Sequence, residues 1–207
     1  MSTGPGYVTD RILATLQTWL PGRLAAIRTA DALTTAQLPD PVLWCRQERP
    51  IDSVNETPAV MIGMLRMTKF DRLEISQQAI NANPVVTLAP AGGALYEATY
   101  ACRVTVVVQA DQWDATSMLR DRYMTAVRFA ILGHMGLGAT DTVAIGTTMR
   151  EAYYVAPDPT RWRTYREGGL EFEVQAIEAE TIPGIGYVDG SKIGIITEIV
   201  AINGPII

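Results

Sequence analysis

The sequence has few of the residues that metal and redox sites commonly use. It contains one histidine, His134, and two cysteines, Cys45 and Cys102. A single histidine without a paired cysteine spacing argues against a zinc site. The two cysteines lie far apart, each in an apolar run, so we expect two reduced, buried thiols, with a disulfide as the alternative. We therefore expect neither a metal ion nor another cofactor.

Long apolar runs and an excess of positive charge are also missing. No run reaches the roughly 18 residues that a membrane-spanning helix needs, and the N-terminal stretch MSTGPGYVTDR does not resemble a secretory signal. The net charge of −5 argues against a protein that binds nucleic acid through its phosphates. Only two of the 17 basic residues are lysines, a bias that favours subunit contacts through arginine or reflects a GC-rich genome. These features predict a protein without membrane contact that stays under cytoplasm-like conditions.

What the chain does contain is a periodic pattern of apolar residues, which make up 48% of its 207 residues. Helical spacing predicts one helix over Tyr7–Leu20, interrupted by Pro21 and Gly22, with a further turn or two toward Ala32. A second helix is predicted over Ala115–Leu132, capped by Asp111 or Asp114 and ended by Gly133. Its apolar face comprises Leu119, Tyr123, Ala126, Val127, Ala130 and Ile131.

Outside the arm and the C-terminal extension, strands are predicted at Val42–Arg46, Ala59–Met67, Tyr96–Gln109, Val143–Val155 and Leu170–Ile177, and the arm has possible strands at Leu73–Ile75 and Val85–Leu88. Gly168 and Gly169 precede the strand at Leu170–Ile177, which forms either a hairpin with the preceding residues or one strand with a glycine bulge. The predicted fold is α+β: a mixed, mostly antiparallel sheet with helices packed on one face, plus an extended arm and a C-terminal β extension. The domain covers residues 1–179, with the arm at about 68–95, and the extension covers 180–207.

A catalytic site is not evident. Ser117, His134 and Asp141 can be named as a triad, but no nucleophile motif accompanies them. The glycines of 133–138 follow a helix and do not open one, which is the wrong context for a dinucleotide loop. Asp111, Asp114 and Asp121 are explained by capping, with a weak cation site as the alternative. We expect no enzymatic activity.

The segment Lys192–Ile202 predicts assembly, because it is apolar on both faces of a strand. Such a strand needs cover, and a neighbouring subunit is the simplest source of it. The subunit-interface candidates are Ile193, Ile195, Ile196, Ile199 and Ile202, with Trp162, Arg163, Tyr165, Arg120 and Arg122. For the 162–166 stretch the alternatives are an ordinary sheet surface or stacking on nucleic acid. Glu171 and Glu173 alternate with apolar residues and either line the lumen of a ring or serve solubility.

The chain resembles the tail terminator, or tail completion, proteins of long-tailed bacteriophages over roughly residues 7–179. The likeness lies in the order of the elements and in their pattern of apolar and polar residues. It is carried by LPGRLAAIRT, PAVMIGML, TYACRVTVVVQA, DATSMLRDRYMTAVRFAIL and RWRTYREGGLEFEVQAIE. The C-terminal extension after about residue 180 is more than the minimal family pattern needs.

The resemblance implies a structural virion protein whose homohexameric ring caps the head-proximal end of the tail tube and ends tube polymerisation. Its partners would be further copies of itself, the tail tube protein and a neck or head completion protein, while DNA passes through without specific binding. The protein would be assembled in the host cytoplasm and located in the virion tail or neck. A head–tail connector or stopper is one alternative, and a small ligand-binding or enzymatic α+β domain is another.

Overall fold

The computed structural model describes residues 4–51, 53–73, 95–139, 142–154 and 165–179. These residues form two long helices, one short 3-10 helix and a five-stranded sheet with strand order β1-β2-β3-β5-β4. The bounds in chain order are α1 Pro5–Ala30, β1 Leu43–Cys45, η1 Val54–Glu56, β2 Ala59–Leu73, β3 Leu95–Gln109, α3 Trp113–Leu132, β4 Thr142–Tyr154 and β5 Tyr165–Ala179.

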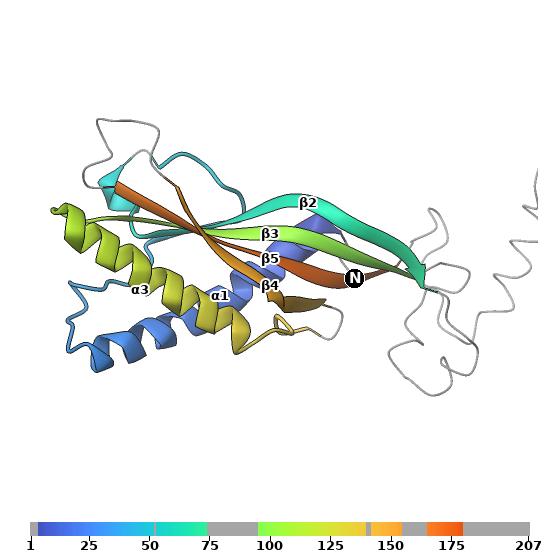
Figure 1. The fold of residues 1–207 in the computed structure, drawn as a ribbon, viewed down its shortest axis with the longest axis horizontal. Helices are drawn as coiled ribbons and strands as arrows, with labels where there is room; N and C mark the ends of the chain where they lie inside the picture. Colours follow the sequence, from blue (N-terminus) through green and yellow to red (C-terminus); the bar gives the residue numbers. More distant parts are fainter. Residues whose placement is uncertain (1–3, 52, 74–94, 140–141, 155–164, 180–207) are drawn as a thin grey trace, which may run out of the picture. The chain divides into compact units, whose positions relative to one another are not determined.

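The predicted α+β class is confirmed. β1 pairs with β2 in parallel and β4 pairs with β5 antiparallel, so the sheet is mixed and mostly antiparallel. Both long helices lie on the same face of the sheet (Figure 1), where α1 packs against α3 and α3 contacts β4. The predicted arm at about 68–95 is shorter than expected at its ends, because residues 68–73 belong to β2 and residue 95 begins β3. Its remaining residues 74–94 and the C-terminal extension at 180–207 lie outside the described residues.

The chain divides into two compact units. The first comprises Met1–Thr68 and Thr99–Ala176 and contains both long helices. The second comprises Lys69–Ala98 and Ile177–Ile207. In its described part, Lys69 forms ion pairs of 2.9 Å with Asp71 and with Glu97, and the Phe70 and Tyr96 rings stack with centroids 4.7 Å apart.

Helix α1 corrects one prediction, because it does not stop at Pro21. Proline inside a helix removes one hydrogen bond and costs about 3 kcal/mol. The apolar stripe nevertheless continues through it at every fourth residue, and all its members are fully buried: Val8, Ile12, Leu16, Leu20 and Leu24. Burying Leu20 and Leu24 contributes about 1.5–3 kcal/mol for each side chain. Packing beyond the proline therefore outweighs the lost hydrogen bond.

Helix α3 confirms its predicted apolar face and corrects its predicted cap. The six residues assigned to the apolar face are all buried, and Gly133 is the C-cap residue. The N-cap residue is Gln112, without a side-chain cap, instead of Asp111 or Asp114. The fully buried Thr116 hydroxyl lies 2.8 Å from the Gln112 carbonyl oxygen and 3.2 Å from that of Ala110, so it ties this turn to the end of β3.

Strand β5 is one continuous strand, and the irregularity lies in its partner β4. Gly168 and Gly169 pair in register with Tyr153 and Ala152. The register shift falls between Ile145 and Arg150 of β4. There the Thr148 hydroxyl accepts a hydrogen bond from the Glu173 N–H at 2.8 Å and donates one to the Ile145 carbonyl at 2.7 Å. A side chain thus replaces backbone pairing at the bulge.

Candidate functional site

Strand β5 has two faces of opposite character. Leu170, Phe172, Val174 and Ala176 are buried, while Glu171, Glu173 and Gln175 are partly exposed, as the alternation predicted. A methyl group added at Gly168 would lie 2.9 Å from Met124 Sδ of α3. Because side chains alternate along a strand, the even-numbered residues of β5 face the helices and the odd-numbered glutamates face away from them.

Strand β3 continues the same division. Cys102, Val104 and Val106 are fully buried, whereas Val107 belongs to a separate small cluster with Ile51, formed by the loop after β1. Arg103 and Thr105 therefore lie on the side turned away from the helices. We call this side the polar face, and it comprises Arg103, Thr105, Arg150, Glu167, Glu171 and Glu173, with Glu48 reaching over it from the loop after β1.

An ion-paired network centres on Glu48. Arg103 donates to both of its carboxylate oxygens, through Nε at 2.6 Å and through Nη2. The Thr105 hydroxyl donates to the same carboxylate. Burial raises the pKa of Glu48, but the hydrogen bonds from Arg103 and Thr105 and the positive charge of Arg103 outweigh it, so the pKa lies below its ordinary value. Glu48 is thus held as a carboxylate.

Glu167 on β5 has the opposite shift. Burial raises its pKa, the negative charge of Glu48 adds to the increase, and Arg103 offsets only part of it. Farther along the face, Arg150 Nε lies 2.9 Å from Glu171 Oε2. Each arginine of the polar face therefore has a carboxylate partner, while the face carries four glutamates in all. Its net charge is negative.

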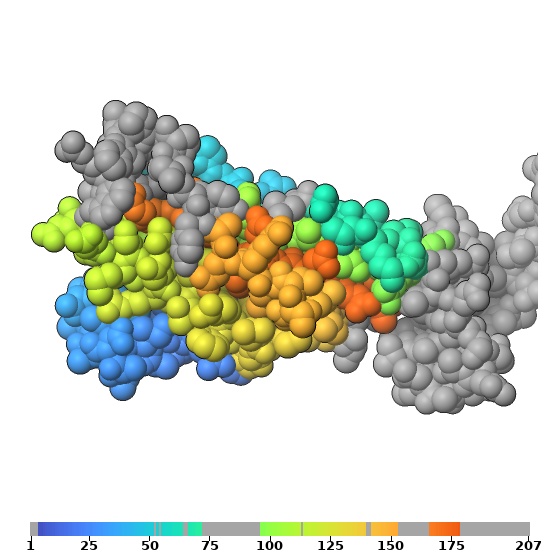
Figure 2. Space-filling model, in the orientation of Figure 1, coloured from blue at the N-terminus to red at the C-terminus, as the bar shows by residue number. Residues whose placement is uncertain are grey.

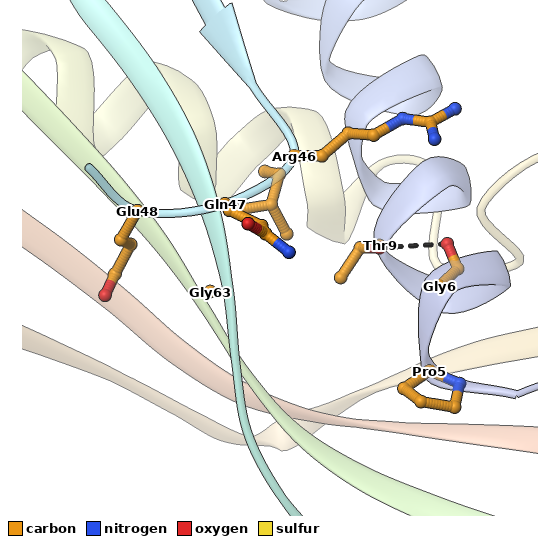
Figure 3. A pocket seen from close by; sticks show the side chains of 8 residues that line it. Pro5, Gly6, Thr9, Arg46, Gln47, Glu48 and Gly63 are labelled. Carbon is orange, nitrogen blue, oxygen red and sulfur yellow. Dashed lines mark hydrogen bonds between the residues drawn. The ribbon is translucent and has the colours of Figure 1, made fainter.

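A cavity of about 500 Å³ lies beside this network. Its walls come from the start of α1, the segment after β1 and strand β2 (Figure 3). Thr9 donates to the Gly6 carbonyl oxygen at 2.9 Å, and Arg46 Nε lies 2.8 Å from Asp10 Oδ1. A methyl group at Gly63 would lie 2.9 Å from the Glu48 carboxyl carbon, so a larger residue there would displace the Glu48 carboxylate where it crosses β2.

The predicted interface residues fall into two groups. Trp162, Arg163 and the isoleucines at 193, 195, 196, 199 and 202 lie outside the described residues, and Tyr165 begins β5. Arg120 and Arg122 lie on α3, with Arg120 Nη2 2.8 Å from Asp121 Oδ1 and Arg122 Nε 2.9 Å from Asp31 Oδ2. Their side chains are 17% and 24% exposed, so most of their surface is already covered within the chain.

The structure describes several of the residues considered for chemistry. His134 stacks on Trp19 with ring centroids 3.8 Å apart, and Asp141 lies outside the described residues. Both cysteines are free, as predicted; Cys102 is buried, which raises its pKa to about 12, and Cys45 is half-buried. Within the described ranges, no group of three histidine, cysteine, aspartate or glutamate residues could hold a metal ion. The same part of the chain contains no helix long and apolar enough to cross a membrane.

Sequence reasoning missed the partnership of Glu48 with Arg103. Glu48 lies in a polar loop and Arg103 in the middle of an apolar strand, 55 positions away. The one available signal was Arg103 itself, because a charge inside a β-branched run needs a partner when the run is central in a sheet.

Comparison with known proteins does not assign the chain to a family. No protein-family model matches the sequence, and no curated protein matches it.

Proposed function

We propose that this chain is a structural virion protein that forms a ring, caps the head-proximal end of a phage tail tube and joins the tail to the head or neck. The observation that supports this proposal is the two-sided sheet of the first unit. One face is covered by α1 and α3. The other carries the ion-paired, net acidic network of Glu48, Glu167, Glu171 and Glu173.

A ring through which DNA passes needs an inner wall that does not hold the DNA. A surface of net negative charge repels the phosphates, and arginines already engaged by carboxylates have little capacity to bind them. Arg103 and Arg150 are engaged in this way. In the proposed ring the polar face therefore lines the lumen and the helices face outward. This arrangement gives Glu171 and Glu173 their predicted lumenal role.

A ring also needs an edge at which copies meet. Among the described strands, β4 is the long strand at one end of the sheet, with 13 residues. The edge of such a strand offers backbone N–H and C=O groups to an added strand. The bulge between Ile145 and Arg150 divides β4 into two shorter stretches for pairing. Contacts of this head-to-tail kind close into a ring when the rotation between copies closes.

Electron microscopy of the purified full-length protein is the direct test. We expect closed rings and, in mass measurement by light scattering, a multiple of the 22.6 kDa chain. Rings that bind purified tail tubes support a tail terminator, whereas rings that bind only DNA-filled heads support the connector or stopper alternative. A protein that stays monomeric at high concentration and binds neither particle contradicts the proposal.

The charge of the lumen has its own test. Glu173→Lys in the polar face should make the rings retain double-stranded DNA at low salt, and this retention should fall steeply as salt increases. Asp114→Lys is the matched control, because Asp114 is exposed in the first turn of α3, on the helical side. Equal DNA retention by the two variants would contradict a lumenal polar face.

A ligand-binding domain is the second candidate, and the cavity is the observation that favours it. Its volume of about 500 Å³ lies within the usual range for small-molecule sites. Thermal-shift screening with small anions and metabolites tests this candidate. A ligand that stabilises the wild type, but not a Gln47→Trp variant that fills the cavity, would favour it.

A further inference from the structure

An exposed apolar surface lies where α3 ends and β4 begins. We call it the α3-end patch and define it as Trp19, Phe129, Leu132 and Met135. These side chains are 37–50% exposed in the single chain. In Figure 2 the end of α3 and the start of β4, coloured yellow to orange, lie side by side on the viewed surface.

Several contacts make these residues one surface. Phe129 and Leu132 are neighbours at helical spacing. A methyl group at Gly146 would lie within 3.3 Å of Leu132 and 3.8 Å of Met135. The Ala144 N–H donates to the Met135 carbonyl at 2.7 Å, which holds the loop after α3 against β4. Trp19 joins from α1 by stacking on His134. Contiguous exposed apolar surfaces of this kind mark interaction sites.

The rim of the patch is positively charged. The guanidinium of Arg11 lies beside Gly138 and donates from Nε to the Leu137 carbonyl at 3.1 Å. The guanidinium of Arg23 lies beside Gly133, at the end of α3. Arg128 lies over the Phe129 ring, 5.4 Å from its centroid, but it is ion-paired to Glu151, so the positive charge of the rim comes from Arg11 and Arg23. The fitting partner is therefore an apolar segment with acidic residues beside it.

We propose that the α3-end patch binds the apolar segment Lys192–Ile202 of a second copy of this chain. Residues 180–207 contain three acidic residues, Glu180, Asp189 and Glu198, and one basic residue, Lys192. Lys192–Ile202 itself is neutral and apolar on both faces, which matches the patch, and the acidic residues Glu180 and Asp189 that precede it match the arginine rim. The segment is taken from a second copy because the proposed ring needs a contact that links one subunit to the next.

The path of the chain is compatible with this exchange. Val174 of β5 pairs with Ala144, whose N–H donates to the Met135 carbonyl, so β5 passes near the patch. The stretch from Ala179 to Lys192 can span up to about 45 Å when extended. The proposal names the contact that links neighbouring copies and rests on the proposed ring for their arrangement.

Photo-crosslinking between two differently tagged full-length copies tests the proposal. One copy carries p-benzoylphenylalanine in place of Phe129, and the control carries it in place of Met118, which is 53% exposed on the same helix. We expect crosslinks between copies from position 129 that map to residues 192–202, and none of these from position 118. Crosslinks within one chain, crosslinks to another region, or no crosslinks from position 129 would overturn the proposal.

A second variant measures the strength of the contact without a reactive group. Phe129→Ser combined with Met135→Ser should weaken self-association about tenfold or more, since tenfold corresponds to about 1.4 kcal/mol. Met118→Ser is the control and should leave it unchanged. Both positions are exposed, so circular dichroism should show the wild-type fold. Equal association of the two variants would overturn the proposal.

The outcomes separate this inference from the proposed function. Rings that cap tail tubes while position 129 crosslinks elsewhere would refute the inference alone. Crosslinks from position 129 to residues 192–202 in an assembly that neither closes into rings nor binds tubes would refute the proposed function alone.

Discussion

At the scale of single residues, two glutamates on the polar face differ in how firmly they hold a proton. Arg103 and Thr105 donate to the carboxylate of Glu48, whereas burial and the charge of Glu48 act against the charged form of Glu167. Position in the network, and not residue type, therefore sets their contributions to stability.

We predict that Glu167→Gln stabilises the protein at pH 7. The pKa of Glu167 in the folded chain is raised above the ordinary value of 4.5, so ionisation costs the folded state more than the unfolded state. This cost is absent well below pH 4.5 and grows as the pH rises through the folded pKa. Urea unfolding at pH 7 and at pH 4 should show the gain at pH 7 only. A gain of equal size at both values would contradict the assignment.

Glu48→Gln should behave in the opposite way. The pKa of Glu48 is lowered in the folded chain, so its contribution is fully present above the ordinary pKa and is lost as the pH falls through the folded pKa. We expect a loss of about 1 kcal/mol in the free energy of unfolding at pH 7. The same urea titrations should show this loss shrinking in acid, and a loss that persists unchanged at pH 3 would contradict the prediction.

Gly168 is required by close packing. An added methyl group would lie 2.9 Å from Met124 Sδ and 3.2 Å from Arg120 Cγ, and Met124 is itself buried. Gly168→Ala should therefore cost about 1–3 kcal/mol. Gly22→Ala is the matched control, because nothing lies within 4 Å of the added methyl group inside α1. It should stabilise the protein by roughly 0.5–1 kcal/mol. Thermal unfolding that ranks the two variants the other way would contradict this reading of the packing.

At the scale of elements, α1 shows that local preference and packing can oppose each other within one helix. Pro21→Ala restores a backbone donor in the helix interior and should raise the free energy of unfolding by about 1–3 kcal/mol. Pro5→Ala is the control, since proline in the first turn removes no hydrogen bond and should have little effect. Calorimetry compares the two melting temperatures. No gain from Pro21→Ala would mean that the helix has adapted fully to the proline.

The bulge in β4 depends on one hydroxyl group. Thr148→Val keeps the shape of the side chain but removes both the acceptor for the Glu173 N–H and the donor to the Ile145 carbonyl. We expect a loss of about 1–3 kcal/mol, because partly buried backbone groups lose their partner. Thr147→Val, at the exposed neighbouring position, should be nearly neutral. Hydrogen exchange at the Glu173 amide should accelerate in the first variant and not in the second.

At the scale of the whole molecule, assembly and folding should be separable. Deleting Lys192–Ile207 should weaken ring formation far more than it lowers the melting temperature. The deleted residues belong to the second unit, whereas the buried side chains of α1 and α3 belong to the first. Mass measurement by light scattering beside a thermal melt checks this. Rings that form as readily without the segment would contradict its role in assembly.

Much of the fold could be predicted, because periodic burial leaves a direct trace in the sequence. The alternation of Leu170, Phe172 and Val174 with glutamates predicted a strand with two unlike faces, and the apolar face of α3 was predicted residue by residue. Errors arose where a distant contact overruled a local signal. Pro21 did not end α1, and Thr116 with the backbone of Gln112, instead of an aspartate, orders the start of α3.

The sequence by itself determined the fold class, the strands and the two-faced character of β5, because these follow from side-chain periodicity between near neighbours. Only the tertiary structure decided which groups meet across the fold: Glu48 with Arg103, Thr148 with Glu173, and the residues that make up the α3-end patch. Such pairs are far apart along the chain, and their attraction acts only after packing has brought their elements together. No local pattern records them in advance.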